Sequence, residues 1–128
     1  MENKYRILIV HNKYQIPGGE DTVVQNEIAM LKENGHAVFE YIRSNDELNA
    51  CRGVFKLCKG FEAIYSPKTK REVQKIIQRE QIDIVHVHNT LSVVSPSVFY
   101  AAFACKVPVV QTLHNFRMVC PNALLYRD

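Results

Sequence analysis

Histidines and other polar side chains follow two apolar runs of this 128-residue chain. His86 and His88 are two residues apart, so on a strand they share one face of the sheet, with His88 nearer the carboxyl end. His114, Asn115 and Arg117 follow the next apolar run and combine an imidazole, an amide and a permanent cation. This chemistry suits sugar hydroxyls and phosphates.

Each of these histidines also has a structural interpretation. We expect His86 to be packed and hydrogen-bonded within the sheet, whereas His88 either reaches a ligand site or is held in the sheet. His114 either contacts a ligand or anchors the loop that follows it. The two strand histidines could also bind a metal with His114 or Cys120, but their spacing matches no recognised zinc pattern, and we expect no metal.

A glycine turn leads into a predicted helix. Residues 17–21 read Pro-Gly-Gly-Glu-Asp, and the exposed N–H groups at the start of a helix can approach a phosphate closely. The dinucleotide-binding pattern G-x-G-x-x-G and the P-loop pattern are both absent. The turn is therefore either a phosphate cradle or an ordinary strand-to-helix turn with acids in the first helical turn.

Strands alternate with helices along the chain. Short, β-branched runs without polar alternation are typical of parallel strands covered on both faces. We predict strands at residues 6–10, 37–42, 82–88 and 107–113, and loops at residues 11–19 and 114–128.

Apolar residues at helical spacing predict three helices. The first begins at Glu20 and ends before Gly35, which is expected to take a left-handed conformation. Pro67 begins the second, and Ser95 caps the third, which continues to about residue 104. The third helix is apolar on every side, so we expect it to be buried. Residues 44–65 are expected to be partly helical.

Repeated strand–helix units predict one α/β domain over residues 1–128, a Rossmann-like three-layer α/β/α fold with a mainly parallel sheet. Ligands of such sheets bind beyond the carboxyl ends of the strands. This rule brings residues 11–20, 88–90 and 114–122 to one edge of the sheet.

Composition narrows the classes of function. The 16 Lys and Arg residues against 13 Asp and Glu residues give a formal charge of +3, too small an excess to make nucleic acid an expected partner. A hydrophobic content of 47% argues against disorder. The charged beginning of the chain and four cysteines without a C-x-x-C pair favour a cytoplasmic protein.

Cations and apolar side chains are interleaved over residues 52–61, and Lys68, Lys70 and Arg71 follow. This stretch is either an amphipathic helix packed on the sheet with a solvated basic rim, or a peripheral contact with the anionic inner face of a membrane.

Four motifs occur in order along nearly the whole chain: residues 17–21, Asn34-Gly-His at 34–36, DIVHVHN at 83–89, and PVVQTLHN at 108–115 with its continuation to residue 122. Together they resemble the amino-terminal domain of the GT-B retaining glycosyltransferases of family 4 (group 1). The resemblance implies that the chain is one GT-B lobe.

The resemblance implies transfer of a sugar, of hexosyltransferase type, from a UDP- or GDP-sugar to a sugar or lipid-linked acceptor. The resemblance also implies that the configuration is retained, that no metal or other cofactor takes part, and that the products are cell-surface polysaccharides or glycolipids. His114 matches the histidine that contacts the donor sugar, so it is the catalytic candidate. The substrate-binding candidates, among which the glycines would lie near the donor phosphates and the acceptor, are Gly18, Gly19, Glu20, Asp21, His88, Asn89, Asn115 and Arg117.

The chain departs from the family pattern at Ala123, where relatives continue with glycine. The resemblance covers only the amino-terminal domain of the family, and the second Rossmann-like domain, which carries an E-x7-E motif and holds most of the nucleotide, is not part of it. We expect the carboxy-terminal donor domain to lie outside this chain, and the chain alone to be inactive. The alternative is a stand-alone α/β binding or interaction module completed by a separate donor-domain chain. A flavodoxin-like phosphoacceptor is disfavoured because residues 11–13 read His-Asn-Lys where acids would be required.

Overall fold

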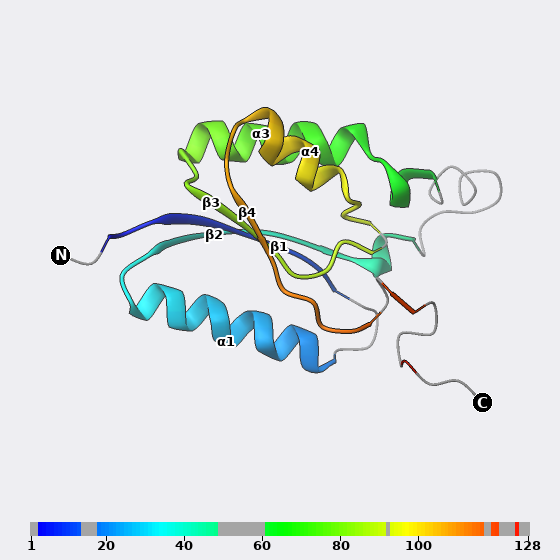
Figure 1. The fold of residues 1–128 in the computed structure, drawn as a ribbon, viewed down its shortest axis with the longest axis horizontal. Coiled ribbons are helices and arrows are strands. Elements are labelled where there is room, and N and C mark those ends of the chain that lie inside the picture. The colour runs from blue at the N-terminus through cyan, green and yellow to red at the C-terminus, as the bar shows by residue number, and fades with distance from the viewer. Residues whose placement is uncertain are drawn as a thin grey trace.

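Four parallel strands form the central sheet of the computed structural model (Figure 1). The structure describes residues 3–13, 18–48, 61–91, 93–116, 119–120 and 125. The strands are β1 (Arg6–Lys13), β2 (Ala37–Ser44), β3 (Ile84–Val87) and β4 (Val109–Gln111), in the order β2-β1-β3-β4. Their carboxyl ends therefore lie at the same edge.

Helices cover both faces of this sheet (Figure 1). Helix α1 (Gly19–Glu33) lies on one face, and helices α3 (Pro67–Glu80) and α4 (Ser97–Ala104) lie on the other. A short 3-10 turn, η1 (Asn45–Leu48), follows β2. The layers confirm the predicted Rossmann-like α/β/α fold.

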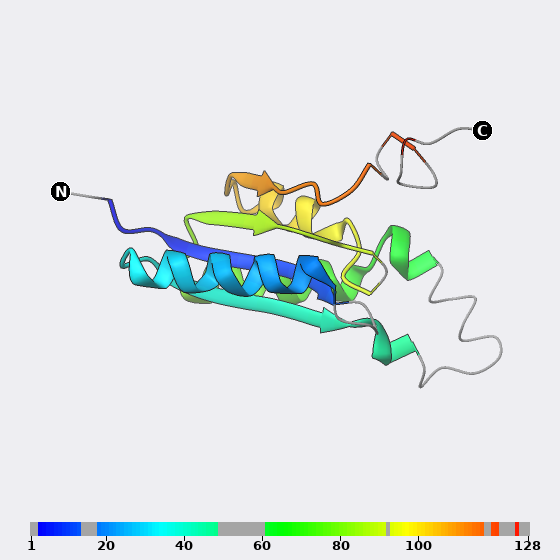
Figure 2. The same ribbon diagram turned by 90° about the horizontal axis from the view of Figure 1, so that it is seen from below.

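Helix α1 packs through one apolar stripe. Val24 and Ile28 are buried against Ile7 and Ile9 of β1. Gly35 follows the helix with a φ of +81°, as expected of a left-handed residue after the last turn. Figure 2 shows that α1 lies over β1 and β2, whereas β3 and β4 lie to one side of the helix.

The other face of the sheet carries the larger core. Leu8, Val85 and Val87 are buried there against residues of α3 and α4 such as Val73 and Val98. Helix α3 begins as predicted at Pro67, where the Ser66 side chain accepts a hydrogen bond from the Thr69 N–H at 3.2 Å.

The lengths of the strands differ from prediction. Strand β1 continues to Lys13, because its ladder with β2 runs on until Lys13 pairs with Ser44. The prediction that a loop begins at His11 is therefore wrong, and His11 and Asn12 are buried. Strands β3 and β4 are shorter than predicted, since their mutual ladder includes only three residue pairs.

Helix α4 differs from prediction in its start and in its burial. It begins at Ser97, and Ser95 has a φ of +67° with its hydroxyl accepting from the Ser97 N–H at 3.1 Å. Tyr100 is 58% exposed and Phe103 is 84% exposed, so the expected burial on every side is wrong. The helix packs one side against α3 and the sheet, whereas on the other side Tyr65 meets the Tyr100 ring edge-on and Phe103 stays exposed among the described residues.

Most of the basic and apolar stretch predicted as a membrane contact, residues 52–60, lies outside the described residues. Phe61, Lys68 and Arg71 within the described part are exposed. None of the described helices has the length and apolar character needed to cross a membrane.

The one-sided packing of α1 can be tested by paired substitutions. Ile28→Ala should lower the free energy of unfolding by about 2–5 kcal/mol, because it removes buried methyl groups and leaves a cavity. Met30→Ala, at a half-exposed position of the same helix, should change it by less than about 0.5 kcal/mol. Urea unfolding measures both, and equal losses would contradict this packing.

Candidate functional site

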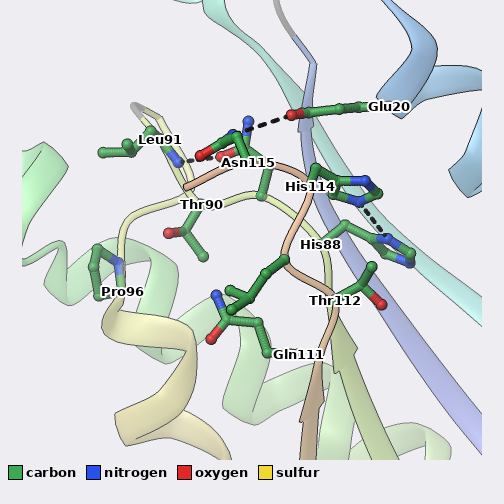
Figure 3. Close-up of a pocket in the computed structure, with 11 residues that line it drawn as sticks. Glu20, His88, Thr90, Leu91, Pro96, Gln111, Thr112, His114 and Asn115 are labelled. Atoms are coloured by element: carbon green, nitrogen blue, oxygen red, sulfur yellow. Dashed lines mark hydrogen bonds between the residues drawn. The ribbon is translucent and has the colours of Figure 1, made fainter. Parts of the chain in front are cut away.

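A cavity of about 170 Å³ lies at the carboxyl ends of β3 and β4 (Figure 3). Five of the predicted site residues line it: Glu20, His88, Asn89, His114 and Asn115. They come from the start of α1 and from the segments that follow β3 and β4. The position agrees with the rule that parallel α/β sheets bind ligands at this edge.

Two hydrogen bonds bring these segments together. The His88 Nδ1 atom lies 3.0 Å from the His114 Nε2 atom, and the two rings meet edge to edge, with centroids 5.2 Å apart and planes inclined by 24°. The Asn115 amide donates to the Glu20 carboxylate at 3.3 Å, which connects the segment after β4 to the first turn of α1. Figure 3 shows both contacts on the same side of the cavity.

Asn89 holds the loop that follows β3. Its side-chain amide donates to the Asn12 carbonyl at 3.3 Å, and its oxygen accepts from the Leu91 N–H at 3.1 Å. Both ends of the side chain thus have partners within the protein. Asn89 shapes the wall of the cavity as well as lining it.

Asn12 is a structural residue that sequence reasoning missed. Its fully buried side-chain oxygen accepts from the Val93 and Val94 N–H groups at 3.0 and 3.2 Å, and its amide donates to Asn45 at 2.8 Å. The oxygen therefore joins the end of β1 to the loop after β3, and the amide joins it to η1 after β2. An amide two residues after the apolar run of residues 7–10 is the signal that could have found it.

The Asp21 side chain caps the first turn of α1. Its Oδ2 atom accepts from the Gly18 N–H at 3.1 Å, and its Oδ1 atom lies 2.9 Å from the His11 Nε2 atom. Burial alone would raise the pKa of Asp21, but the hydrogen bonds from His11 and Gly18 outweigh it and hold the pKa below its ordinary value. The carboxylate, predicted to bind substrate, has protein partners at both oxygens.

Gly18 and Gly19 leave open space at the start of α1. A Cβ atom added at either position would meet no other atom within 4 Å. Neither glycine is required by packing among the described residues, and the space admits a ligand close to the backbone. The remaining predicted site residue, Arg117, lies outside the described residues.

A second polar cluster lies beneath the cavity, on the face of the sheet that carries α1. Glu27 Oε1 is 2.7 Å from His86 Nδ1, and Glu27 Oε2 is 3.5 Å from His88 Nε2. The other nitrogen of His86, Nε2, lies 2.8 Å from the Thr112 hydroxyl oxygen, so this histidine is hydrogen-bonded in the sheet as expected.

Sequence reasoning also missed Glu27. The residue stands on the inward face of α1, between Val24 and Ile28, where the pattern requires an apolar side chain. A carboxylate at such a position needs a buried partner, and that requirement is the signal that could have found it.

The cluster has three groups that could ligate a metal. The ligand atoms of Glu27, His86 and His88 all lie within 4.8 Å of one another. The two imidazole rings, however, are stacked, with centroids 4.5 Å apart and planes inclined by 24°. Because a histidine lone pair lies in the ring plane, nearly parallel rings do not direct their nitrogens at one point. This arrangement favours a hydrogen-bonded network over a metal centre.

His88 is the most enclosed member of the network. Its side chain has no exposed surface, and its Nε2 atom has no hydrogen-bond partner. Burial, followed by the nearby His86, His114 and His11, lowers the pKa of His88 to about 4. The ring is therefore neutral near pH 7, with one nitrogen protonated and the other free to accept.

The role of Asn12 gives a test of how the cavity wall is held. Asn12→Ala should lower the free energy of unfolding by about 2–4 kcal/mol, because it leaves the buried Val93 and Val94 N–H groups without acceptors. Asn3→Ala, an exposed position, should change it by less than about 0.5 kcal/mol. Urea unfolding measures both. Hydrogen exchange that is no faster at Val93 and Val94 would count against the bridge.

Comparison with known proteins agrees with this geometry. The model of Glycosyltransferase Family 4 matches residues 17–125, which include the glycine turn, both strand histidines and His114. No curated protein matched the chain. Since the family match extends over most of the sequence and the sheet has the architecture of a GT-B lobe, this chain belongs to Glycosyltransferase Family 4.

Proposed function

We propose that this chain is the acceptor-side lobe of a retaining glycosyltransferase that transfers a sugar from a UDP- or GDP-sugar to a sugar or lipid-linked acceptor. The observation that carries the proposal is the cavity at the carboxyl edge, where His88, His114, Asn115 and Glu20 converge. Membership of Glycosyltransferase Family 4 supports the reaction class.

The chemistry of the cavity fits a carbohydrate. Imidazole, amide and carboxylate groups offer the mixture of donors and acceptors that sugar hydroxyls require. The volume of about 170 Å³ is below the roughly 300–1,000 Å³ usual for small-molecule sites. This favours a cleft completed by a second, donor-binding domain, without which we expect no turnover.

Charge suggests how the two substrates are arranged. The donor diphosphate is attracted by the N–H groups at the start of α1, next to Gly18 and Gly19. The Glu20 carboxylate would repel phosphate but accept hydrogen bonds from hydroxyls, which favours placing the acceptor or the sugar ring beside it. In this arrangement His114 contacts the donor sugar, Arg117 offsets negative charge, and no metal takes part.

The cellular setting is also a proposal. Exposed basic side chains on α3, including Lys68, Arg71 and Arg79, support contact with an anionic membrane surface. Such contact would bring a cytoplasmic enzyme to lipid-linked acceptors, in keeping with synthesis of cell-surface polysaccharide or glycolipid.

His114 gives the first test of the proposed function. In the full-length protein, His114→Ala should lower kcat/KM by about 10²-fold, or roughly 3 kcal/mol, because a transition-state contact is lost. His36→Ala is the matched control, since His36 precedes β2 at the opposite end of the sheet and should leave kcat/KM within about twofold. Release of nucleoside diphosphate from a panel of UDP- and GDP-sugars, with sugar and lipid-linked acceptors, measures both.

If no donor in the panel supports transfer, the proposed function is wrong. If transfer occurs and His114→Ala keeps the original kcat/KM, the proposed reaction is supported but the proposed role of His114 is wrong.

The glycine turn gives a second test. Gly19→Ala should leave the free energy of unfolding unchanged or raise it by up to about 1 kcal/mol, because alanine favours a helix and the added methyl group meets open space. We expect kcat/KM to fall about tenfold, because the methyl group would occupy space used by a substrate. Thermal unfolding and steady-state kinetics measure the two effects.

Gly35→Ala is the contrasting control. Its left-handed backbone should make alanine destabilising by about 1–2 kcal/mol with no change in kcat/KM. If Gly19→Ala leaves kcat/KM unchanged, the prediction that the glycine turn contacts a substrate is wrong.

A further inference from the structure

A continuous line of polar groups runs from α1 to the cavity. Glu27 of α1 faces His88 at the end of β3, and His88 faces His114 after β4 (Figure 3 shows the last two). His114 lines the cavity, whereas Glu27 does not. Glu27 therefore does not touch a ligand in the cavity, and the path of polar contacts from Glu27 to the cavity passes through His88 and His114.

The positions of the protons follow from the chemistry of Glu27. An ionised carboxylate can only accept hydrogen bonds, so its Oε1 atom accepts one from the His86 Nδ1–H group at 2.7 Å. Its Oε2 atom lies 3.5 Å from the buried His88 Nε2. A lone pair on that nitrogen would face a negative charge, whereas an N–H group would be attracted to it. His88 therefore favours the tautomer protonated at Nε2.

The proton on His88 then determines the proton on His114. A neutral His88 with its proton on Nε2 has a lone pair on Nδ1, which can only accept. The atom opposite, His114 Nε2 at 3.0 Å, must be the donor. A neutral His114 that carries its proton on Nε2 has Nδ1 left as an acceptor.

We propose that Glu27 and His88 are positioning residues that hold His114 in the Nε2-protonated tautomer, so that its Nδ1 atom accepts a hydrogen bond from a substrate hydroxyl. This inference rests on the proposed function, in which His114 contacts a sugar.

We call the path from Glu27 through His88 to His114 the relay. Other groups around His88 support the neutral state of His88 that the relay requires. His11 of β1 meets its ring edge-on, His86 of β3 stacks against it, and His114 lies beside its Nδ1 atom. A positive charge on any of these rings would oppose one on His88, and full burial opposes it as well. Glu27 is the nearest group that would favour a charge, but it also pairs with His86.

The substitution Glu27→Gln should reverse the relay. A glutamine whose oxygen accepts from His86 Nδ1 presents its amide N–H to His88 Nε2, and that nitrogen must then accept. The proton of His88 moves to Nδ1 and donates to His114 Nε2, so the proton of His114 moves to Nδ1. Glu27→Asp keeps an acceptor-only carboxylate and should keep the original tautomer.

Nitrogen-15 NMR of the full-length protein, labelled at histidine, distinguishes the two tautomers of each ring. We expect His114 to be protonated at Nε2 in the native protein and in Glu27→Asp, and at Nδ1 in Glu27→Gln. Glu33→Gln, an exposed change on the same helix, should leave every histidine unchanged. In sugar transfer, Glu27→Gln should lower kcat/KM at least tenfold, and Glu27→Asp should retain more activity.

A native His114 protonated at Nδ1 would overturn the proposal even if Glu27→Gln failed to fold. In a folded Glu27→Gln whose His86 stays protonated at Nδ1, an unchanged His114 tautomer would also overturn it, as would stoichiometric zinc that binds with loss of the His88 Nε2 proton. If the tautomers behave as expected but the native protein transfers no sugar, the proposed function fails and the relay stands. If transfer occurs with the other tautomer, the relay alone fails.

Discussion

The parallel pairing of β3 with β4 is the constraint on which the site depends. Because the two strands run in the same direction, the chain leaves both at one edge, and His88 meets His114 although 26 residues separate them. The parallel β1 brings Asn12 to the same edge, where it holds the loop after β3. An antiparallel strand at any of these places would send its polar end to the opposite side of the domain.

The face of the sheet that carries α1 is apolar along β1 but holds a buried polar network at β3 and after β4. Helix α1 buries Ile7 and Ile9 of β1, but beyond it the same face carries His86, His88 and Thr112. Buried polar groups lower stability unless they are hydrogen-bonded, so these side chains pair with one another and with a carboxylate from α1. A network of this kind holds its members in defined orientations. Group transfer depends on such orientation, because a misplaced contact stabilises the transition state poorly.

Sequence patterns alone determined the order of strands and helices, the left-handed Gly35, the helix start at Pro67, and the edge at which five of the predicted site residues gather. These features depend on local periodicity, on capping and on the parallel connection of neighbouring strands, all of which can be recognised within short segments. The motifs within residues 17–122 further indicated the family, which the family model confirmed.

Only the tertiary structure decided where β1 ends, which side of α4 is covered, that Glu27 contacts the strand histidines, and that Asn12 holds the cavity wall. The end of β1 depends on how far β2 runs beside it, and the exposure of Phe103 depends on what packs across the helix. Glu27 stands on an otherwise apolar helical face, and its partner His86 comes from a distant strand. A side chain's burial and its hydrogen-bond partner are properties of the neighbours that folding brings to it, and those neighbours are far away in the sequence.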